Sequence, residues 1–340
     1  MKDEAYTGLP GSPHHISRRG FGARLIGAAG FAVATGHAPP ARAATEIQMV
    51  PIPVSIPVSV TSPYQYQGLS NDPWSCSVSG AIANVFGLGS QVRVRRSVDQ
   101  FAVYTVTDVR YQDPVNRVRM GSVARERVGT PNVFSGTLHT PLATKLMSDT
   151  QAKNAGEFVE RIADSPNNHG LVVLAPHGGV IEVKTDLQAR WVMDELPNAD
   201  VSCWICSGWT TEGGAHTRWH VASTELHPVS FPGLATIANR GFAYAVAFHG
   251  MNDAGVRIGG SAPFELKEML RQAIKHAVGD YPVAHAADDD PNGGTSPDNV
   301  VNWITAGGVG GVHLEQGPLI RSKYWFAVAQ AVADVFRGLV

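Results

Sequence analysis

The sequence predicts an α/β fold in which a mostly parallel or mixed central sheet carries helices on both faces. Three observations support this prediction. Apolar runs of strand length recur from Leu171–Ala175 onward, and runs without polar alternation are typical of strands that are buried on both faces. Segments with helical periodicity separate these runs, as expected for strands joined by helical crossovers. Histidines and glutamates stand at the ends of several runs, where ligand sites of such sheets lie.

The composition describes a folded protein with many turns. The 340 residues are 44% hydrophobic and only 16% charged, with 36 glycines and 22 prolines. This balance excludes wholesale disorder, and the absence of a regular repeat excludes collagen and solenoid proteins. The formal net charge of −2 gives no electrostatic footprint for nucleic acid, so we expect no nucleic-acid partner.

Residues 1–43 have the pattern of an export signal. The sequence SRRGF at 17–21 precedes a weakly apolar run at 25–34 and the small-residue site ARA at 41–43. The arginine pair is typical of a twin-arginine signal. It predicts the twin-arginine export machinery as a partner, and an extracellular, periplasmic or cell-envelope location. The apolar run is too short and too rich in glycine and alanine for a permanent membrane span.

Two segments separate this signal from the α/β domain, which we expect at residues 131–340. Segment 44–89 has prolines within short runs of valine and isoleucine, a pattern that excludes a helix or a central strand. We therefore expect an extended arm on the surface or along a sheet edge. In segment 90–130, apolar residues alternate with Arg, Gln and Thr, and this period of two predicts a small antiparallel sheet.

The periodicity predicts the remaining elements in order. We expect strands at 171–175, 201–205, 219–224, 243–248 and 312–315. We expect helices at 148–163, 185–196, 229–239, 263–278 and 323–339, with Thr185 or Asp186 as the N-cap of the second. Cys203 and Cys206 have the spacing of a redox motif. Because a disulfide does not close easily across this spacing on a regular strand, we interpret both as small core residues.

Three of the expected strands end in residues that can serve a metal site. His177 and Glu182 follow the first strand, His249 follows the fourth, and Glu315 ends the last. Two imidazoles and one carboxylate can hold Zn²⁺ and leave a position open for water. Gly178 and Gly179 let the backbone turn so that His177 and Glu182 face the same ion. Glu315, outside this set, is a candidate general base. On spacing alone, turn and capping roles stay open for these histidines.

Six short motifs follow one another in a defined order. They are Pro176–Glu182, Trp219–Thr224, Phe248–Gly250, Ile258–Gly260, Asp298–Asn302 and Gly311–Glu315. Together they resemble the motif set of the phage-type poly-γ-glutamate hydrolases, over about residues 90–325. The resemblance implies a zinc carboxypeptidase-like fold with one Zn²⁺ ion on His177, Glu182 and His249. It also implies Glu315 as the general base and Arg321 as the group that binds a substrate carboxylate.

Further polar residues at these motifs are candidate substrate-binding groups. His220 either contacts the substrate or is a core histidine on a strand. Asn299 and Asn302 either line the cleft or belong to a simple turn. His313 is more consistent with a structural position beside the metal ligands. Trp303 stands where the family commonly has arginine, a departure that weakens the expected attraction for an acidic polymer.

These observations predict an exported, zinc-dependent hydrolase of γ-glutamyl amide bonds, with polyglutamate or a γ-glutamyl peptide as its substrate. Two alternatives stay open. The first is an amidase or carboxypeptidase that acts on cell-wall peptides, which also contain γ-linked glutamate. The second is a secreted binding module that has kept the fold and lost catalysis, although the intact set of four candidate residues argues against it.

Overall fold

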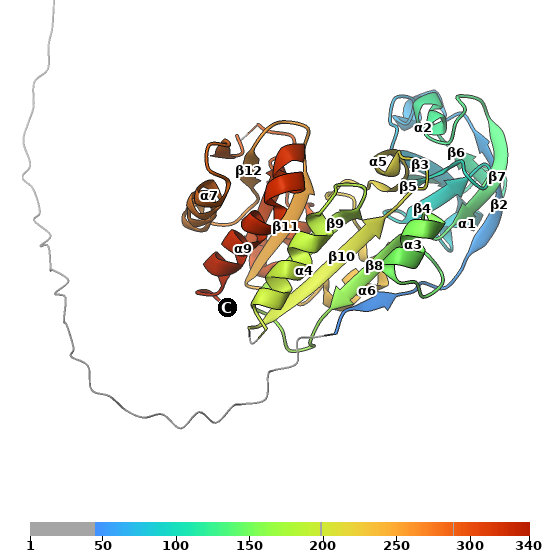
Figure 1. Cartoon of the computed structure of the whole chain (residues 1–340). Coiled ribbons are helices and arrows are strands. Elements are labelled where there is room, and N and C mark those ends of the chain that lie inside the picture. The colour runs from blue at the N-terminus through green and yellow to red at the C-terminus, as the bar shows by residue number, and fades with distance from the viewer. Residues whose placement is uncertain (1–44, 198, 288) are drawn as a thin grey trace, which may run out of the picture. The chain divides into compact units, whose positions relative to one another are not determined.

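The computed structural model describes residues 45–197, 199–287 and 289–340. The expected export signal at 1–43 lies outside these residues. The described chain forms a closed barrel of six strands, followed by an α/β unit built on a sheet of eight strands (Figure 1). No helix in this part of the chain has the length and the apolar character of a membrane span.

The barrel occupies the first third of the described chain. Its strands are β2 (Ser55–Thr61), β3 (Ser75–Ser79), β4 (Gln91–Arg95), β5 (Phe101–Arg110), β6 (Arg117–Arg119) and β7 (Phe134–His139). They close in the order β2-β6-β3-β5-β4-β7. Three short helices, η1 (Gln65–Gln67), α1 (Gly80–Ala83) and α2 (Ser122–Glu126), lie between them in sequence. Alternate side chains, including Val92 and Val94, are fully buried inside the barrel, which confirms the period of two expected at 90–130. The expected small antiparallel sheet is instead part of a closed barrel in which β3 and β5 pair in parallel.

The segment 44–89 is not an extended arm, contrary to the expectation from its prolines. β2 contains Pro57 and pairs with both β6 and β7. The proline is tolerated because the pairing with β6 begins only at Ser59, so the missing N–H removes no bond to that strand. Only β1 (Ile47–Met49) lies along a sheet edge, beside β8. The boundary expected at 130/131 also falls inside the barrel, since β7 completes it.

The large sheet is mixed, as expected. Its order is β1-β8-β10-β9-β11-β14-β12-β13. Its members besides β1 are β8 (Phe158–Ala163), β9 (Leu171–Gly179), β10 (Val201–Gly208), β11 (Tyr244–Gly250), β12 (Val256–Gly259), β13 (Val283–His285) and β14 (Gly311–Gln316). The four central strands, β10, β9, β11 and β14, are parallel, and antiparallel pairs flank them. The carboxyl ends of the central strands therefore meet at one edge.

Helices cover both faces of this sheet. On one face, α4 (Thr185–Glu195), α7 (Phe264–Val278) and α9 (Trp325–Phe336) form a continuous core with Cys203 and other sheet residues. On the other face, α5 (Ala215–Trp219), α6 (Pro232–Ile237) and α8 (Val300–Trp303) pack on Cys206 and its neighbours. Both cysteines are free and buried, which confirms their interpretation as core residues.

Several expected elements have different bounds. The helix expected at 148–163 is only α3 (Asp149–Ala155); Gly156 ends it with a left-handed φ of 65°, and the rest is strand β8. The segment 219–224 is not a strand, because α5 ends at Trp219 and an irregular loop follows. The N-cap of α4 is Lys184. The remaining short helices are η2 (Pro228–Ser230), η3 (Ala306–Gly308) and η4 (Ile320–Tyr324), which leads into α9.

Candidate metal centre and active site

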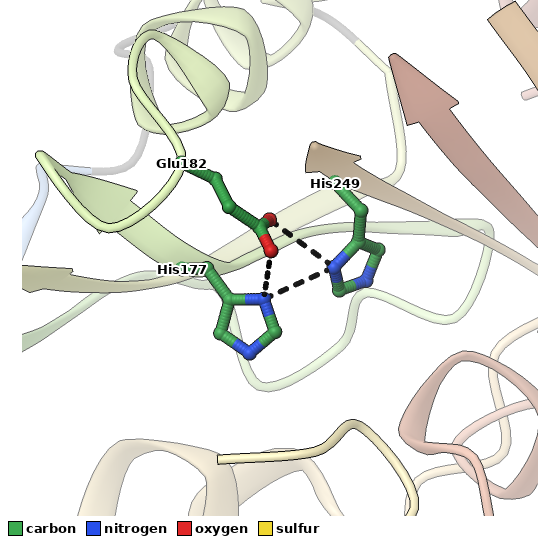
Figure 2. A group of neighbouring side chains, drawn as sticks. All are labelled: His177, Glu182 and His249. Atoms are coloured by element: carbon green, nitrogen blue, oxygen red, sulfur yellow. Dashed lines mark hydrogen bonds and ion pairs between the residues drawn. The ribbon is translucent and has the colours of Figure 1, made fainter. Parts of the chain in front are cut away.

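Three buried side chains converge at the carboxyl edge of the central strands. Figure 2 shows His177, Glu182 and His249 pointing toward one another. The Nδ1 atom of His177 lies 3.0 Å from Oε1 of Glu182 and 3.2 Å from Nδ1 of His249. The Nδ1 atom of His249 lies 3.5 Å from Oε2 of Glu182. The sequence placed these residues at one edge, and the structure brings them into mutual contact.

The backbone around β9 explains how His177 and Glu182 meet. His177 lies near the end of β9, and its carbonyl accepts a hydrogen bond from the N–H of Glu182 at 2.8 Å. The turn between them needs Gly179, whose φ is 71°, a region that favours glycine. Gly178 is also required, because a Cβ there would lie 2.6 Å from the Cβ of Asp186. The expected role of the glycines in this turn is therefore confirmed.

The outer nitrogens of both histidines face one loop. Nε2 of His177 lies 2.8 Å from the carbonyl oxygen of Val221, and Nε2 of His249 lies 3.4 Å from Oγ of Ser223. A carbonyl only accepts, so His177 donates from Nε2, and in the neutral ring Nδ1 is the nitrogen whose lone pair faces the centre. Hydrogen bonds to the outer nitrogen are typical of metal-ligating histidines, because they fix the ring and its tautomer.

The electrostatics of the cluster favour a cation between the side chains. Burial opposes ionisation, yet the adjacent His177 and His249 hold the pKa of Glu182 well below its ordinary value. One carboxylate and two inward imidazole nitrogens form the donor set of a divalent transition metal. In the absence of a proton or a cation, the facing Nδ1 lone pairs would repel one another. The three residues therefore fit a metal ion chemically.

Glu315 lies beside this cluster on the neighbouring strand. β14 pairs with β11 so that Glu315 stands opposite His249. Oε1 of Glu315 lies 3.1 Å from Nε2 of His313, whereas Oε2 is buried and has no hydrogen-bond partner among the described residues. A carboxylate oxygen with no partner beside a cavity is suited to accept a proton.

A second group of possible ligands overlaps the first. His249, His313 and Glu315 also offer ligand atoms within 4.8 Å of one another. The rings of His249 and His313 are stacked with centroids 4.3 Å apart. The first group does not include Glu315, so one ion held by His177, Glu182 and His249 leaves Glu315 outside its ligand set.

Two cavities border the cluster. Cavity A, of about 370 Å³, is lined by Glu182, Glu315, Asp290 and neutral side chains of the 292–299 loop. Cavity B, of about 600 Å³, has Glu182 and Glu315 in common with cavity A and adds Arg257 and Arg321. In the described chain, no lysine or arginine lines cavity A. A substrate that extends through both cavities therefore meets arginine only in cavity B.

Arg321 is the arginine of cavity B that is available to a ligand. Arg257 forms ion pairs with Asp253 and Asp290. Arg321 donates from Nε to the carbonyl of Gln316 at 3.0 Å, and its terminal nitrogens have no partner in the described part of the chain. Its guanidinium lies against Gly250, where a Cβ would stand 2.6 Å from Cζ.

His220 lies in the site but not on a strand. It follows α5, its ring centroid is 4.2 Å from that of His177, and its Nε2 is 3.9 Å from Oε1 of Glu182. Burial and the neighbouring His177 hold the pKa of His220 well below its ordinary value, so the ring is neutral. It lines both cavities.

The two asparagines have different positions. Asn299 lines cavity A, and its Oδ1 caps α8 by accepting from the N–H of Val301 at 3.1 Å. Asn302 is buried away from the cavities: Nδ2 donates to the carbonyls of Gly294 and Ser296 at 2.7 Å each, and Oδ1 accepts from Ser261. Because these backbone groups use its amide, the structure favours the alternative of a turn residue, and substrate binding by Asn302 stays a prediction.

The sequence patterns did not reveal three further residues of the site, two of which orient the histidine metal ligands. Val221 acts through its backbone carbonyl, which no side-chain motif reveals. Ser223 lies in one of the six motifs, but its contact with His249 depends on the course of an irregular loop. Asn292, in both cavities, comes from a loop without a recognisable pattern.

Comparison with known proteins finds one family model and several solved structures that are similar to this chain. The family model for poly-gamma-glutamate hydrolase matches residues 146–330. A bacteriophage poly-gamma-glutamate hydrolase structure is 23% identical, with 53% of this chain and 91% of that chain covered and a TM-score of 0.42. A structure described as "YNDL-apo (Zinc-free)" is 21% identical, with 53% and 89% covered and a TM-score of 0.43.

A more distant structure matches a larger share of the chain. It is a putative carboxypeptidase A from Shewanella denitrificans, 10% identical, with 86% of this chain and 87% of that chain covered and a TM-score of 0.37. No curated protein matches the sequence. Since the family model covers more than half of the 340 residues, this hydrolase belongs to the poly-γ-glutamate hydrolase family.

Proposed function

We propose that this protein is a zinc-dependent hydrolase of γ-glutamyl amide bonds, with poly-γ-glutamate as its substrate. The observation that carries the proposal is the convergence of His177 Nδ1, His249 Nδ1 and the Glu182 carboxylate at one point. The unpartnered Oε2 of Glu315 lies beside that point.

His177, Glu182 and His249 would hold one Zn²⁺ ion. When bound, zinc polarises a carbonyl group and brings the pKa of a bound water to about 7. Glu315 then acts as the general base: Oε2 accepts the proton of the attacking water and returns it to the leaving amine nitrogen. The hydrogen bond between Oε1 and His313 keeps the other oxygen of Glu315 turned toward the cavity.

Arg321 would select the substrate. Each unit of poly-γ-glutamate carries a free α-carboxylate, and a guanidinium binds a carboxylate through two parallel hydrogen bonds. The two free terminal nitrogens of Arg321 in cavity B suit this contact. The neutral rings and amides of His220 and Asn299 are positioned to contact the remainder of the substrate.

The proposal is tested with purified protein, poly-γ-glutamate and metal analysis. We expect about one zinc per chain and release of shorter γ-glutamyl chains. The Glu315→Gln variant should keep the zinc and lose hydrolysis. A variant that hydrolyses poly-γ-glutamate at the wild-type rate would exclude Glu315 as the general base. Stoichiometric zinc without hydrolysis of any γ-glutamyl substrate would instead favour the binding module.

Cell-wall peptides are a second candidate substrate, favoured by the charge of cavity A. That cavity has acidic and neutral lining residues, including Asp290, so a second carboxylate of poly-γ-glutamate finds no cation there. A γ-glutamyl link to a diamino acid would place an amine on this side. Comparison of kcat/KM for poly-γ-glutamate and for a γ-glutamyl-diamino acid peptide separates the two substrates.

We also propose that the protein is exported. The support is the twin-arginine pattern at 17–21 and the ARA site at 41–43. Expressed in a bacterium with twin-arginine export, the protein should lose its first 43 residues and leave the cytoplasm. Replacement of Arg18 and Arg19 by lysine should retain it inside.

A further inference from the structure

Among the contacts between the barrel and the α/β unit, one set reaches a segment that is close to the metal centre. This segment, residues 215–230, contains α5, an irregular loop and η2. The barrel lies outside residues 146–330, which match the family model. It nevertheless contacts this segment on both sides of the irregular loop at residues 220–224.

At the first end, Arg127 joins the barrel to α5. Its Nε and Nη2 donate to the carbonyl of Thr217 at 2.9 and 2.7 Å. Its Nη1 donates to the carbonyls of Pro73 and Val103 in the barrel at 2.9 and 2.8 Å. The guanidinium also lies over the ring of Trp74 at 4.2 Å. The planar fork of arginine thus fixes α5 relative to two barrel segments.

At the second end, two barrel residues hold Glu225 and Ser230. The hydroxyl of Thr105 donates to Oε2 of Glu225 at 2.7 Å. The side chain of Gln91 donates to the carbonyl of Glu225 at 2.7 Å, and its backbone N–H donates to Oγ of Ser230 at 2.7 Å. These bonds come from two neighbouring strands, β4 and β5.

Residues 220–224 lie between these two ends and carry the groups that orient the metal ligands. The carbonyl of Val221 accepts from His177, and Oγ of Ser223 contacts His249. The ring of Trp74 packs edge-on against His220 at 5.5 Å. Because this loop has no regular secondary structure, its course depends on where its ends are held.

We propose that the barrel positions the metal centre by holding both ends of the 220–224 loop, and that Arg127 is the main positioning residue. This inference rests on the proposed metal site. Loss of the Arg127 contacts lets α5 shift, and with it the Val221 carbonyl that fixes the His177 ring. Removal of such supporting contacts typically weakens metal affinity about 10- to 100-fold.

The experiment measures zinc affinity, by competition with a chelator, in the full-length protein and in two matched variants. Arg125 lies in α2, and Arg127 is the C-cap of the same helix. Arg125 is more deeply buried, and among the described residues its side chain bonds only to the Met120 and Pro131 carbonyls. We expect Arg127→Gln to weaken zinc binding at least 10-fold and Arg125→Gln to change it less than threefold. Thr105→Val, which removes one hydroxyl, should weaken it by a smaller factor.

Cobalt spectra supply a readout that a general loss of stability does not change. With Co²⁺ bound, the absorption bands of folded Arg127→Gln should shift relative to the wild type, and those of folded Arg125→Gln should not. Equal zinc affinity of the wild type and both the Arg127→Gln and Thr105→Val variants overturns the inference. Absence of zinc binding in the wild type overturns the proposed metal site instead, so the two failures are distinguishable.

Discussion

The Nδ1 atoms of His177 and His249 lie 3.2 Å apart at the carboxyl edge of the central strands. Their outer nitrogens face the carbonyl of Val221 and the hydroxyl of Ser223, both in one loop. The Nδ1 atoms of both rings and the Glu182 carboxylate therefore face one buried point. A divalent cation bound there is held by three groups that the unfolded chain does not bring together, so metal binding and folding stability should be coupled.

Zinc should stabilise the folded protein. At a free zinc concentration of 100 times Kd, the free energy of unfolding should rise by about 2.7 kcal/mol. Calorimetry with zinc and with a chelator measures the change in Tm. The control is His249→Ala, which should show little zinc-dependent change. An equal rise of Tm in this variant would mean that the stabilising zinc is bound elsewhere.

Glu315→Gln should lower kcat by about 10²- to 10⁴-fold, the usual contribution of a positioned general base. The amide keeps the shape of the side chain but cannot accept the proton of water. Zinc affinity should stay near the wild-type value, since Glu315 lies outside the proposed ligand set. Steady-state kinetics and metal titration on the same sample check both parts; a variant that loses zinc together with activity would make Glu315 a ligand.

Arg321→Gln should lower kcat/KM for a substrate with a free α-carboxylate by about 10- to 100-fold, since hydrogen bonds between charged groups contribute about 1.5–3 kcal/mol. Gly250→Ala should also lower kcat/KM for this substrate, because the Cβ of the alanine would stand 2.6 Å from Cζ of Arg321 and displace the guanidinium. Kinetics with an α-amidated substrate provide the control. If both variants lose as much activity on the amide as on the acid, Arg321 does not bind the carboxylate.

Asn302→Ala and Asn299→Ala should separate stability from substrate binding. Asn302 bonds to three backbone groups, so its loss should lower the free energy of unfolding by about 1–3 kcal/mol. Asn299 lines cavity A, so its loss should raise KM as well. Denaturant unfolding and kinetics of both variants test this; a larger KM change in Asn302→Ala would return that residue to the substrate site.

Glu160 should make stability depend on pH. Burial raises its pKa from the ordinary value of 4.5 to about 7, despite hydrogen bonds from Trp204 and from the N–H groups of Gly233 and Leu234. A raised carboxyl pKa means that the folded state binds the proton more tightly than the unfolded state. The contribution of Glu160 to the free energy of unfolding is complete below pH 4.5 and is lost as the pH rises to about 7. The loss is up to about 1.4 kcal/mol for each pH unit.

Chemical unfolding of the wild type and of Glu160→Gln between pH 5 and 8 measures how the free energy of unfolding changes with pH. The glutamine cannot titrate, so the free energy of unfolding of the variant should lack the part of this pH dependence that comes from Glu160. Identical slopes in the two proteins would show that Glu160 has the same pKa in the folded and unfolded states.

The central sheet and most of the metal centre were predictable because they depend on local patterns. Buried parallel strands such as β9 are continuous apolar runs, and their carboxyl ends meet at one edge. His177, His249 and Glu315 could therefore be expected together from their positions at strand ends. Glu182 followed from the glycines that let the turn after β9 close.

The barrel was not predictable because its closure depends on pairings between distant segments. β2 pairs with β7 about eighty residues away, and its proline hides it from pattern analysis. Phe158, Val159 and Ile162 fit one face of a helix, yet they lie in β8 because Gly156 ends α3. The role of Asn302 depends on loops whose course has no sequence signature.

The most direct test of the account is hydrolysis of poly-γ-glutamate by the full-length protein before chelation, after chelation, and after zinc is restored. With His177, Glu182 and His249 as ligands, chelation should abolish release of γ-glutamyl products, and zinc should restore it in the wild type but not in His249→Ala. Undiminished hydrolysis in the fully chelated protein would contradict a metal-dependent reaction at this site.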